Sequence, residues 1–309
     1  MKESQIAIGI DIGGSHITSA AVALDGPKIL PHTTFSAKVD NKAPKDRILK
    51  NWSSAINKTL ECVSMAGTVR LGFAMPGAFN YRTGLAKFEG NAKYESLYNV
   101  SIPNELPKFI ETHKVDMRFL NDATAFGVGV STLGKAKNFS QIISITLGTG
   151  FGSAFIKDGV PQVSSKGVPA GGCLWDKPYK DGMADDYFST RWCLGRYYEL
   201  SGQKVGGVKE IAQSNDGHSQ TLFEEFGSHM AEFMIPYLRQ YCPELIILGG
   251  NVSKASPLFL PVLRRKVKAA GIRTDFEVSD LMEDAAIMGS AKLFDSHFWE
   301  QVKDDLPEL

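Results

Sequence analysis

Cysteine is scarce in this sequence. Its 309 residues include four cysteines, none of them in a CxxC pair: Cys62, Cys173, Cys193 and Cys242. This spacing excludes a disulfide framework and the common zinc-binding patterns. We therefore expect a protein of the reducing cytoplasm that holds no structural zinc.

Long apolar runs and an excess of one charge are also missing. Asp11 interrupts the apolar start of the chain, and no later run reaches the roughly 18 apolar residues that a membrane span needs. The 34 Lys and Arg residues balance 34 Asp and Glu residues, so no overall field attracts a polyanion. We expect neither export nor a membrane partner, and no nucleic-acid partner.

The remaining composition is that of an ordinary globular protein. Hydrophobic residues make up 43% of the chain and charged residues 22%, and 309 residues are enough for two domains. Apolar or β-branched runs alternate with segments of helical spacing, such as Ile48, Trp52, Ile56 and Leu60. This alternation predicts an α/β architecture.

Two glycine-tipped hairpins are predicted. Residues 5–24 form two apolar runs around DIGGS, and residues 141–159 repeat this pattern around LGTGFG. Glycine lets backbone N–H groups approach phosphate oxygens closely. A third glycine turn follows the apolar run ELIIL. The residues expected to bind a nucleotide are Gly13, Gly14, Ser15, Gly148, Thr149, Gly150, Gly249 and Gly250.

Each loop alone also has a simpler interpretation, in which it is a tight turn that needs glycine at positive φ. The occurrence of two matched hairpins with a third turn favours phosphate binding. Asp11, at the end of the first apolar run, is a candidate to hold a hydrated Mg²⁺. His16 either meets phosphate or is an exposed turn residue.

Taken together, these segments resemble the ROK family (repressor, open reading frame, kinase) of sugar kinases, within the actin, Hsp70 and hexokinase superfamily. The resemblance covers nearly the whole chain and rests on DIGGS (11–15), MPG (75–77), LNDATAF (120–126), TLGTGFGSA (146–154), LGGNVS (248–253) and DAAIMGSAKL (284–293). It implies an α/β fold of two ribonuclease-H-like lobes, with nucleotide and sugar in a central cleft. We expect the first lobe at 1–118, with the terminal helix 290–309 packed on it, and the second lobe at 119–289.

The resemblance also implies roles for single residues. Asp122 matches the family's catalytic base, and Asn121, Asn91 and Gly77 match positions at the sugar. Without the motifs, Asp122 is interpreted as a cap of the following helix. Glu89 is either a further sugar contact or a solvated loop charge.

The chain departs from the family after Gly167. Many relatives have GExGH there, followed by a cysteine-rich zinc element, whereas this chain has GVPAGGCLWDK. Cys173 stands where a sugar-binding Glu is expected. Asp185 resembles a shortened replacement for a later sugar-binding Glu, or it is a charge at a helix N-terminus. We expect an altered sugar pocket and no structural zinc.

These observations predict a glucokinase-like, ATP-dependent kinase that uses Mg²⁺ and phosphorylates a hexose or hexose derivative. Two alternatives stay open: polyphosphate as the donor, and a catalytically silent sugar sensor. Family repressors carry a DNA-binding segment ahead of the first loop, and only ten residues precede Asp11, which favours the kinase branch. Relatives often form homodimers, so the resemblance includes a homodimer among the expected assemblies.

Overall fold

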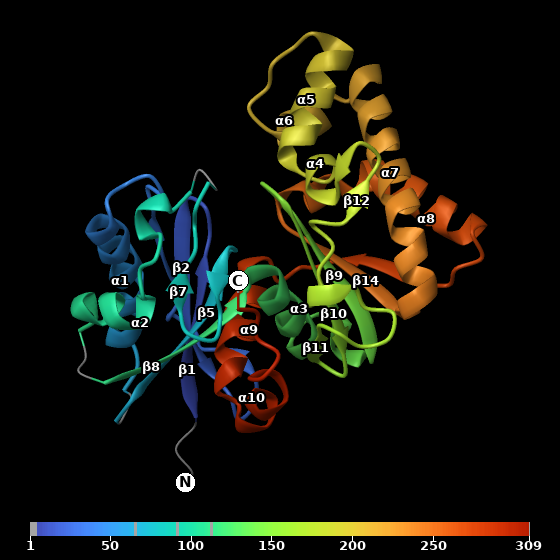
Figure 1. Cartoon of the computed structure of the whole chain (residues 1–309). Helices are drawn as coiled ribbons and strands as arrows, with labels where there is room; N and C mark the ends of the chain where they lie inside the picture. Colours follow the sequence, from blue (N-terminus) through green and yellow to red (C-terminus); the bar gives the residue numbers. More distant parts are fainter. Residues whose placement is uncertain (1–4, 65–66, 91–92, 112–113, 309) are drawn as a thin grey trace. The chain divides into compact units, whose positions relative to one another are not determined.

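The computed structural model describes residues 5–64, 67–90, 93–111 and 114–308. The chain divides into two compact units. Unit 1 contains Met1–Lys137 and Glu283–Leu309, and unit 2 contains Asn138–Met282. Each unit is built on one main sheet with helices around it (Figure 1).

The sheet of unit 1 has six strands, which are β1 (Ile6–Ile12), β2 (His16–Ala23), β3 (Lys28–Ile29), β4 (Phe35–Lys38), β5 (Val69–Met75) and β8 (Val115–Asn121). Their order is β3-β2-β1-β5-β8, with β4 also paired to β2. β1 and β2 form the predicted antiparallel hairpin, while β5 runs parallel to β1 and β8 parallel to β5. The carboxyl ends of β1, β5 and β8 therefore meet at one edge of this sheet.

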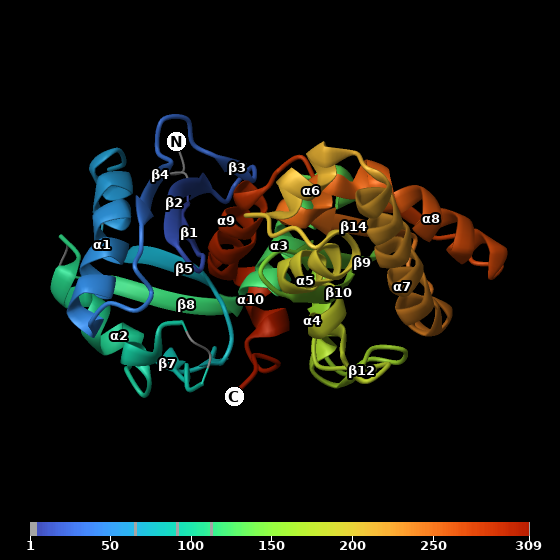
Figure 2. The same cartoon turned by 90° about the horizontal axis from the view of Figure 1, so that it is seen from above.

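Unit 1 also contains a short hairpin and several helices, which are β6 (Phe79–Asn80), β7 (Leu85–Ala86), α1 (Lys45–Glu61), α2 (Ile102–Glu105), α3 (Asp122–Thr132), α9 (Glu283–Ala291) and α10 (Ser296–Val302). α1 and α9 cover opposite faces of the sheet (Figure 2). Ala7, Ile8 and Ile10 of β1 are consequently all 0% exposed. This burial on both faces explains why β1 is a continuous apolar run.

Glycines bring α9 very close to its neighbours in unit 1. A Cβ on Gly9 of β1 would lie 2.1 Å from the carbonyl oxygen of Ile287 in α9. Between α3 and α9 the approach is closer still, because a Cβ on Gly129 would lie 1.8 Å from the oxygen of Ala285. Only glycine fits at such positions, so these residues fix α3 and α9 against each other.

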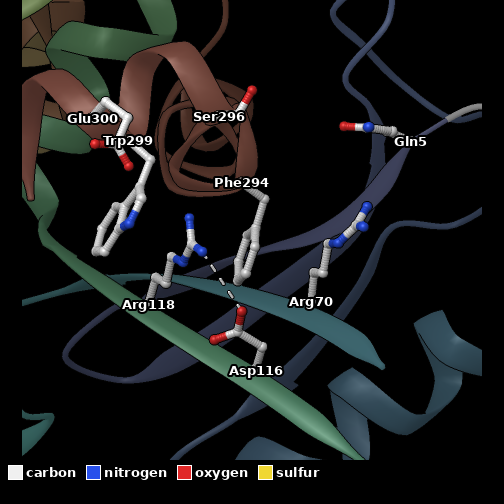
Figure 3. A pocket seen from close by; sticks show the side chains of 8 residues that line it. All are labelled: Gln5, Arg70, Asp116, Arg118, Phe294, Ser296, Trp299 and Glu300. Atoms are coloured by element: carbon white, nitrogen blue, oxygen red, sulfur yellow. Dashed lines mark ion pairs between the residues drawn. The ribbon is translucent and has the colours of Figure 1, made fainter. Parts of the chain in front are cut away.

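The last helix packs on the edge of the same sheet. Arg118 of β8 lies between two aromatic rings, 4.1 Å from the centre of Trp299 and 4.7 Å from that of Phe294 (Figure 3). Its guanidinium also donates to the Leu293 carbonyl oxygen at 2.6 Å. Desolvation by these neighbours lowers the pKa of Arg118. The stacking attaches α10 and the segment before it to β8.

Unit 2 has a five-stranded sheet and a two-stranded one, made of β9 (Gln141–Leu147), β10 (Phe151–Lys157), β11 (Val160–Gln162), β14 (Leu245–Gly249) and β15 (Asp275–Val278), and of β12 (Pro178–Tyr179) and β13 (Gly182–Met183). Its helices are α4 (Ala184–Tyr187), α5 (Thr190–Ser201), α6 (Val208–Ser214), α7 (Gly217–Tyr241) and α8 (Ser256–Ala269). Aromatic residues of α7 and α8, including Phe223, Phe226 and Phe259, build much of its core.

The two main sheets have the same topology. The strand order β11-β10-β9-β14-β15 of unit 2 corresponds position by position to β3-β2-β1-β5-β8 of unit 1. In both units the first hairpin is antiparallel, and the next two strands run parallel to its first strand. The duplication predicted from the two glycine-tipped hairpins is thus present in both sheets, and β4 is an addition in unit 1.

The boundaries of the two units differ from the boundaries predicted for the two lobes. β8 pairs with β5 from Val69↔Val115 to Met75↔Asn121, and α3 follows it directly, so the chain stays in unit 1 up to Lys137. α9 packs on β1, which brings the chain back to unit 1 at Glu283 rather than at residue 290. In the described part of the chain, no helix has the length and apolarity required to cross a membrane.

Candidate active site

The first glycine tip, residues 13–15, joins β1 to β2 in unit 1. Its three carbonyl oxygens all accept hydrogen bonds from neighbouring segments: Gly13 from the Tyr94 hydroxyl at 2.5 Å, Gly14 from the Asn41 amide, and Ser15 from the Val39 N–H at 2.8 Å. The carbonyl groups are therefore turned into the protein. The Ser15 side chain is exposed, as a phosphate-binding loop requires.

The second tip joins β9 to β10 in unit 2 and is held in a similar way. The Gly148 carbonyl oxygen accepts hydrogen bonds from both the backbone N–H and the hydroxyl of Thr190, at 2.9 and 2.8 Å. Thr149, at the end of the tip, is exposed. Thr190 opens α5, so the start of this helix fixes the shape of the tip.

Asp185 also supports the second tip. Its Oδ1 accepts a hydrogen bond from the Phe151 N–H at 2.6 Å, and its Oδ2 pairs with Arg191 at 2.8 Å. A Cβ on Gly150 would lie 2.7 Å from the same Oδ1, so the carboxylate occupies the space that glycine leaves. Both oxygens of Asp185 have protein partners, and these contacts give no support to the sugar contact predicted for it.

The third glycine turn follows β14 and lies against the second tip. Gly250 has φ +82°, and a Cβ there would lie 2.3 Å from the carbonyl oxygen of Leu147, the residue before Gly148. Gly249 pairs with Thr146 of β9. Unit 2 therefore brings together the residues that sequence analysis assigned to the second and third loops.

Asp122 is the first residue of α3, at the carboxyl end of β8. Asn121, not Asp122, caps the helix, because the Asn121 Oδ1 accepts from the Thr124 N–H at 3.2 Å. The Asp122 Oδ1 accepts from the Ala123 N–H at 2.8 Å and from the Asn121 amide at 3.0 Å. The carboxylate is half-buried, and both of these hydrogen bonds go to Oδ1 and leave Oδ2 out.

Burial raises the pKa of Asp122 above 3.8, although the hydrogen bonds from the Ala123 backbone and the Asn121 side chain and the charge of Lys93 oppose this shift. A carboxylate with a raised pKa holds a proton more strongly. This property suits a group that accepts a proton from a substrate hydroxyl.

Asp11 lies at the end of β1 in the same unit. Burial, followed by the carboxylates of Asp122 and Glu283, raises the pKa of Asp11 to about 8. In the described ranges, no three His, Cys, Asp or Glu side chains converge closely enough to hold a metal ion directly. Mg²⁺ usually keeps several waters and uses one or two carboxylates together with substrate phosphates. The acidic surroundings of Asp11 fit such a hydrated ion.

Glu283, at the start of α9, was not among the residues expected here. Its carboxylate accepts from the Thr18 hydroxyl at 2.8 Å and pairs with His16 Nε2 at 3.0 Å. His16 is therefore engaged with a carboxylate. Glu283 lies more than 260 positions from both partners in the sequence, and the only signal for it was an acidic residue at a predicted helix start.

The predicted sugar residues are only partly described. Asn91 lies outside the described residues. Gly77 is exposed, and a Cβ on it would lie 3.8 Å from the hydroxyl of Tyr81. Tyr81 in turn accepts from the Asn121 amide at 3.2 Å and donates to the Met75 carbonyl oxygen at 3.1 Å. Tyr81, which the sequence did not point to, thus lies near Gly77 and is hydrogen-bonded to Asn121.

Cys173 is half-buried, and burial raises the pKa of its thiol. The neutral thiol is therefore its form near neutral pH. A neutral thiol accepts hydrogen bonds weakly compared with the Glu that relatives carry there.

Residues 7–172 match the sequence model of the ROK family. Over 317 aligned residues the chain is 26% identical to a glucokinase of Thermotoga maritima, covering 93% of this chain and 96% of that protein.

Solved structures also share the fold, and two of them are compared with this chain. One is a ROK family glucokinase from Streptomyces griseus in complex with glucose and AMPPNP, with a TM-score of 0.71 at 20% identity over 94% of this chain and 99% of that one. The other is an inorganic polyphosphate/ATP-glucomannokinase from Arthrobacter sp. strain KM, with a TM-score of 0.66 at 25% identity over 93% and 96%. The actin-like duplicated fold implied by the motifs is confirmed. With its motifs, its topology and the family match in agreement, the chain belongs to the ROK family.

Proposed function

We propose that this chain is a carbohydrate kinase that transfers the terminal phosphoryl group of ATP to a hydroxyl of a hexose or hexose derivative. The observation that carries this proposal is Asp122, a half-buried carboxylate of raised pKa in the same unit as the first glycine tip. Family membership supplies the reaction class, since relatives and solved structures of this fold are named glucokinases.

The chemistry asks for alignment, charge neutralisation and one proton acceptor. The acceptor oxygen forms a bond to the terminal phosphorus, and the bond from that phosphorus to the bridging oxygen breaks. ADP leaves with the bonding electrons, and the hydroxyl proton passes to Asp122 Oδ2. The hydrogen bonds to Oδ1 keep the carboxylate oriented during this transfer.

The glycine tips bind the phosphates in this proposal. Because the carbonyl oxygens of residues 13–15 and of Gly148 are held by other groups, the loops present backbone N–H groups and the hydroxyls of Ser15 and Thr149 to anions. Asp11 would hold Mg²⁺ through water, and the ion supplies neutralisation of phosphate charge when bound.

The proposal also covers the hydroxyl that is phosphorylated, the cellular setting, the assembly and the sugar pocket. The family resemblance favours the 6-hydroxyl of a hexose and a cytoplasmic setting, and it includes a homodimer among the assemblies to be tested. Cys173 stands where a Glu is expected, so the predicted pocket lacks one charged hydrogen-bond acceptor. We therefore expect the preferred sugar to be one that does not need this acceptor. Asn91, Asn121 and Gly77 remain the proposed sugar residues.

A second candidate concerns the donor. The Arthrobacter enzyme of this fold is named for both inorganic polyphosphate and ATP. The second tip with its exposed Thr149 would bind the phosphates of either donor, so ATP and polyphosphate are compared directly.

Purified protein incubated with Mg²⁺, either donor, and a panel of hexoses, hexosamines and acylated hexosamines tests the proposal. We expect sugar-dependent ADP formation with at least one member of the panel. Binding of a sugar without turnover from either donor would instead identify a silent sensor. Turnover with polyphosphate alone would reassign the donor.

A further inference from the structure

Lys93 lies beside the first glycine tip and plays no part in the chemistry described so far. Its Nζ is 3.4 Å from the position that a Cβ on Gly14 would take. This distance is that of an ordinary van der Waals contact, so the ammonium group lies directly against the tip. A positive charge therefore occupies the position next to the phosphate-binding tip.

The neighbouring residue fixes this arrangement. Tyr94 is 1% exposed, its hydroxyl donates to the Gly13 carbonyl oxygen at 2.5 Å, and its N–H donates to the Asn41 carbonyl oxygen at 2.8 Å. The Tyr94 ring packs edge-on against Trp52 at 5.5 Å. Because Tyr94 is bonded to the tip itself, the backbone of Lys93 cannot move away from Gly14 without breaking these contacts.

The ammonium group of Lys93 is not engaged by any of the described residues. It forms no ion pair within 4.0 Å and no hydrogen bond with the residues that the structure describes. Its charge nevertheless reaches the base, since it lowers the pKa of Asp122. Lys93 is half-buried. A half-buried lysine that lies beside a phosphate loop and has no partner among the described residues is available to a ligand anion.

We infer that Lys93 binds the phosphoryl group during its transfer and neutralises the charge on its non-bridging oxygens. The inference rests on the proposed kinase function and adds a catalytic residue to it. The transferred phosphorus must pass from the donor at the glycine tip to the acceptor oxygen beside Asp122. Lys93 Nζ lies beside the tip, and its charge acts on Asp122. A cation there stabilises the charge spread over the oxygens in the transition state.

Two variants of Lys93 and one control test this inference. Lys93→Gln removes the positive charge and Lys93→Arg retains it. Lys87→Gln is the control, because Lys87 donates to the Asn99 side chain at 2.8 Å. Initial rates with ATP and the best sugar are measured from pH 5 to 9. We expect the plateau kcat of Lys93→Gln to fall about 10- to 100-fold, with the sugar KM within about threefold of the wild type. Lys93→Arg should retain most of kcat, and Lys87→Gln all of it.

The possible outcomes separate this inference from the proposed function. If the wild type shows no turnover with either donor, the kinase proposal itself fails. If the wild type is active and Lys93→Gln keeps its plateau kcat, the inference is overturned. This holds also if the plateau kcat is kept and only the acid limb of the pH–rate profile moves to higher pH. That shift would mean that Lys93 acts on Asp122 and not on the phosphoryl group. Equal losses in Lys93→Gln and Lys93→Arg would also overturn it.

Discussion

Three carboxylates lie near one another at the carboxyl ends of the unit 1 strands and at the start of α9. Asp11 is the most affected, because burial and the charges of Asp122 and Glu283 raise its pKa to about 8. Without a bound cation, the raised pKa therefore favours the neutral carboxyl of Asp11 near neutral pH. Such an arrangement is typical of sites that bind a cation or transfer a proton.

Replacing Asp11 with Asn should stabilise the metal-free protein at alkaline pH. The folded-state pKa of Asp11 lies above the unfolded value, so the folded state binds more protons, and ionisation lowers the free energy of unfolding as pH rises from 3.8 to about 8. Asn cannot ionise. Each unit of pKa corresponds to about 1.4 kcal/mol. Because Asp11 is only half-buried, we expect the advantage of Asp11→Asn to grow by about 2 to 3 kcal/mol between pH 4 and pH 8.

Urea unfolding in EDTA at the two pH values measures this difference. Asp305→Asn serves as the control, because Asp305 is an exposed aspartate near the C-terminus and its replacement should change nothing with pH. An equal effect of Asp11→Asn at both pH values would contradict the assigned electrostatics.

At the scale of elements, the second tip depends on two helix starts. Thr190 of α5 holds the Gly148 carbonyl oxygen, and Asp185 of α4 accepts the Phe151 N–H at 2.6 Å. Asp185→Ala leaves that N–H without its acceptor, a loss of about 1 to 3 kcal/mol. We expect the KM for ATP to rise about tenfold while the KM for the sugar changes less than about twofold.

Asp186→Ala is the matched control for this prediction. Asp186 lies in the same helix but accepts from the Met183 N–H at 3.0 Å, away from the tip, so the KM for ATP should stay at the wild-type value. The opposite result for Asp185→Ala, a raised KM for the sugar with an unchanged KM for ATP, would support the sugar contact predicted from the sequence.

The contact of α3 with α9 makes a second prediction at this scale. A Cβ on Gly129 or Gly289 would lie 1.8 or 1.9 Å from a backbone oxygen of the facing helix. Gly129→Ala and Gly289→Ala should each lower the free energy of unfolding by about 2 to 3 kcal/mol. Gly195→Ala, in α5 with nothing within 4 Å, should instead raise it by about 0.5 to 1 kcal/mol. Urea unfolding distinguishes these signs, and a stabilised Gly129→Ala variant would contradict the close packing.

At the scale of the whole molecule, the duplicated sheets could be predicted because each repeat contains its own local signal. The hairpins around residues 13–15 and 148–150 are continuous in sequence, with apolar strands on either side of small residues. The alternation of strands and helices gave the α/β class. Asp122 could be proposed as the base because it follows its strand directly and lies within a family motif.

The rest depends on contacts between distant residues, which periodicity does not encode. Glu283 reaches the first tip only because α9 packs on β1, and Asp185 supports the second tip only because α4 folds against β10. The predicted lobe boundaries differ from the boundaries of the two units for the same reason. β8 and α3 contain no composition change that marks them as part of unit 1, and only the pairing of β8 with β5 places them there.

The central claim is that Asp122 accepts the proton of the attacking hydroxyl, and kcat of Asp122→Asn measures it most directly. Asn keeps the size of the side chain and the acceptor for the Ala123 N–H, but it cannot act as the base. We predict that kcat with ATP and the best sugar falls about 10²- to 10⁴-fold, while calorimetry shows sugar binding within a few-fold of the wild type. A kcat that stays within about threefold of the wild type would contradict the account.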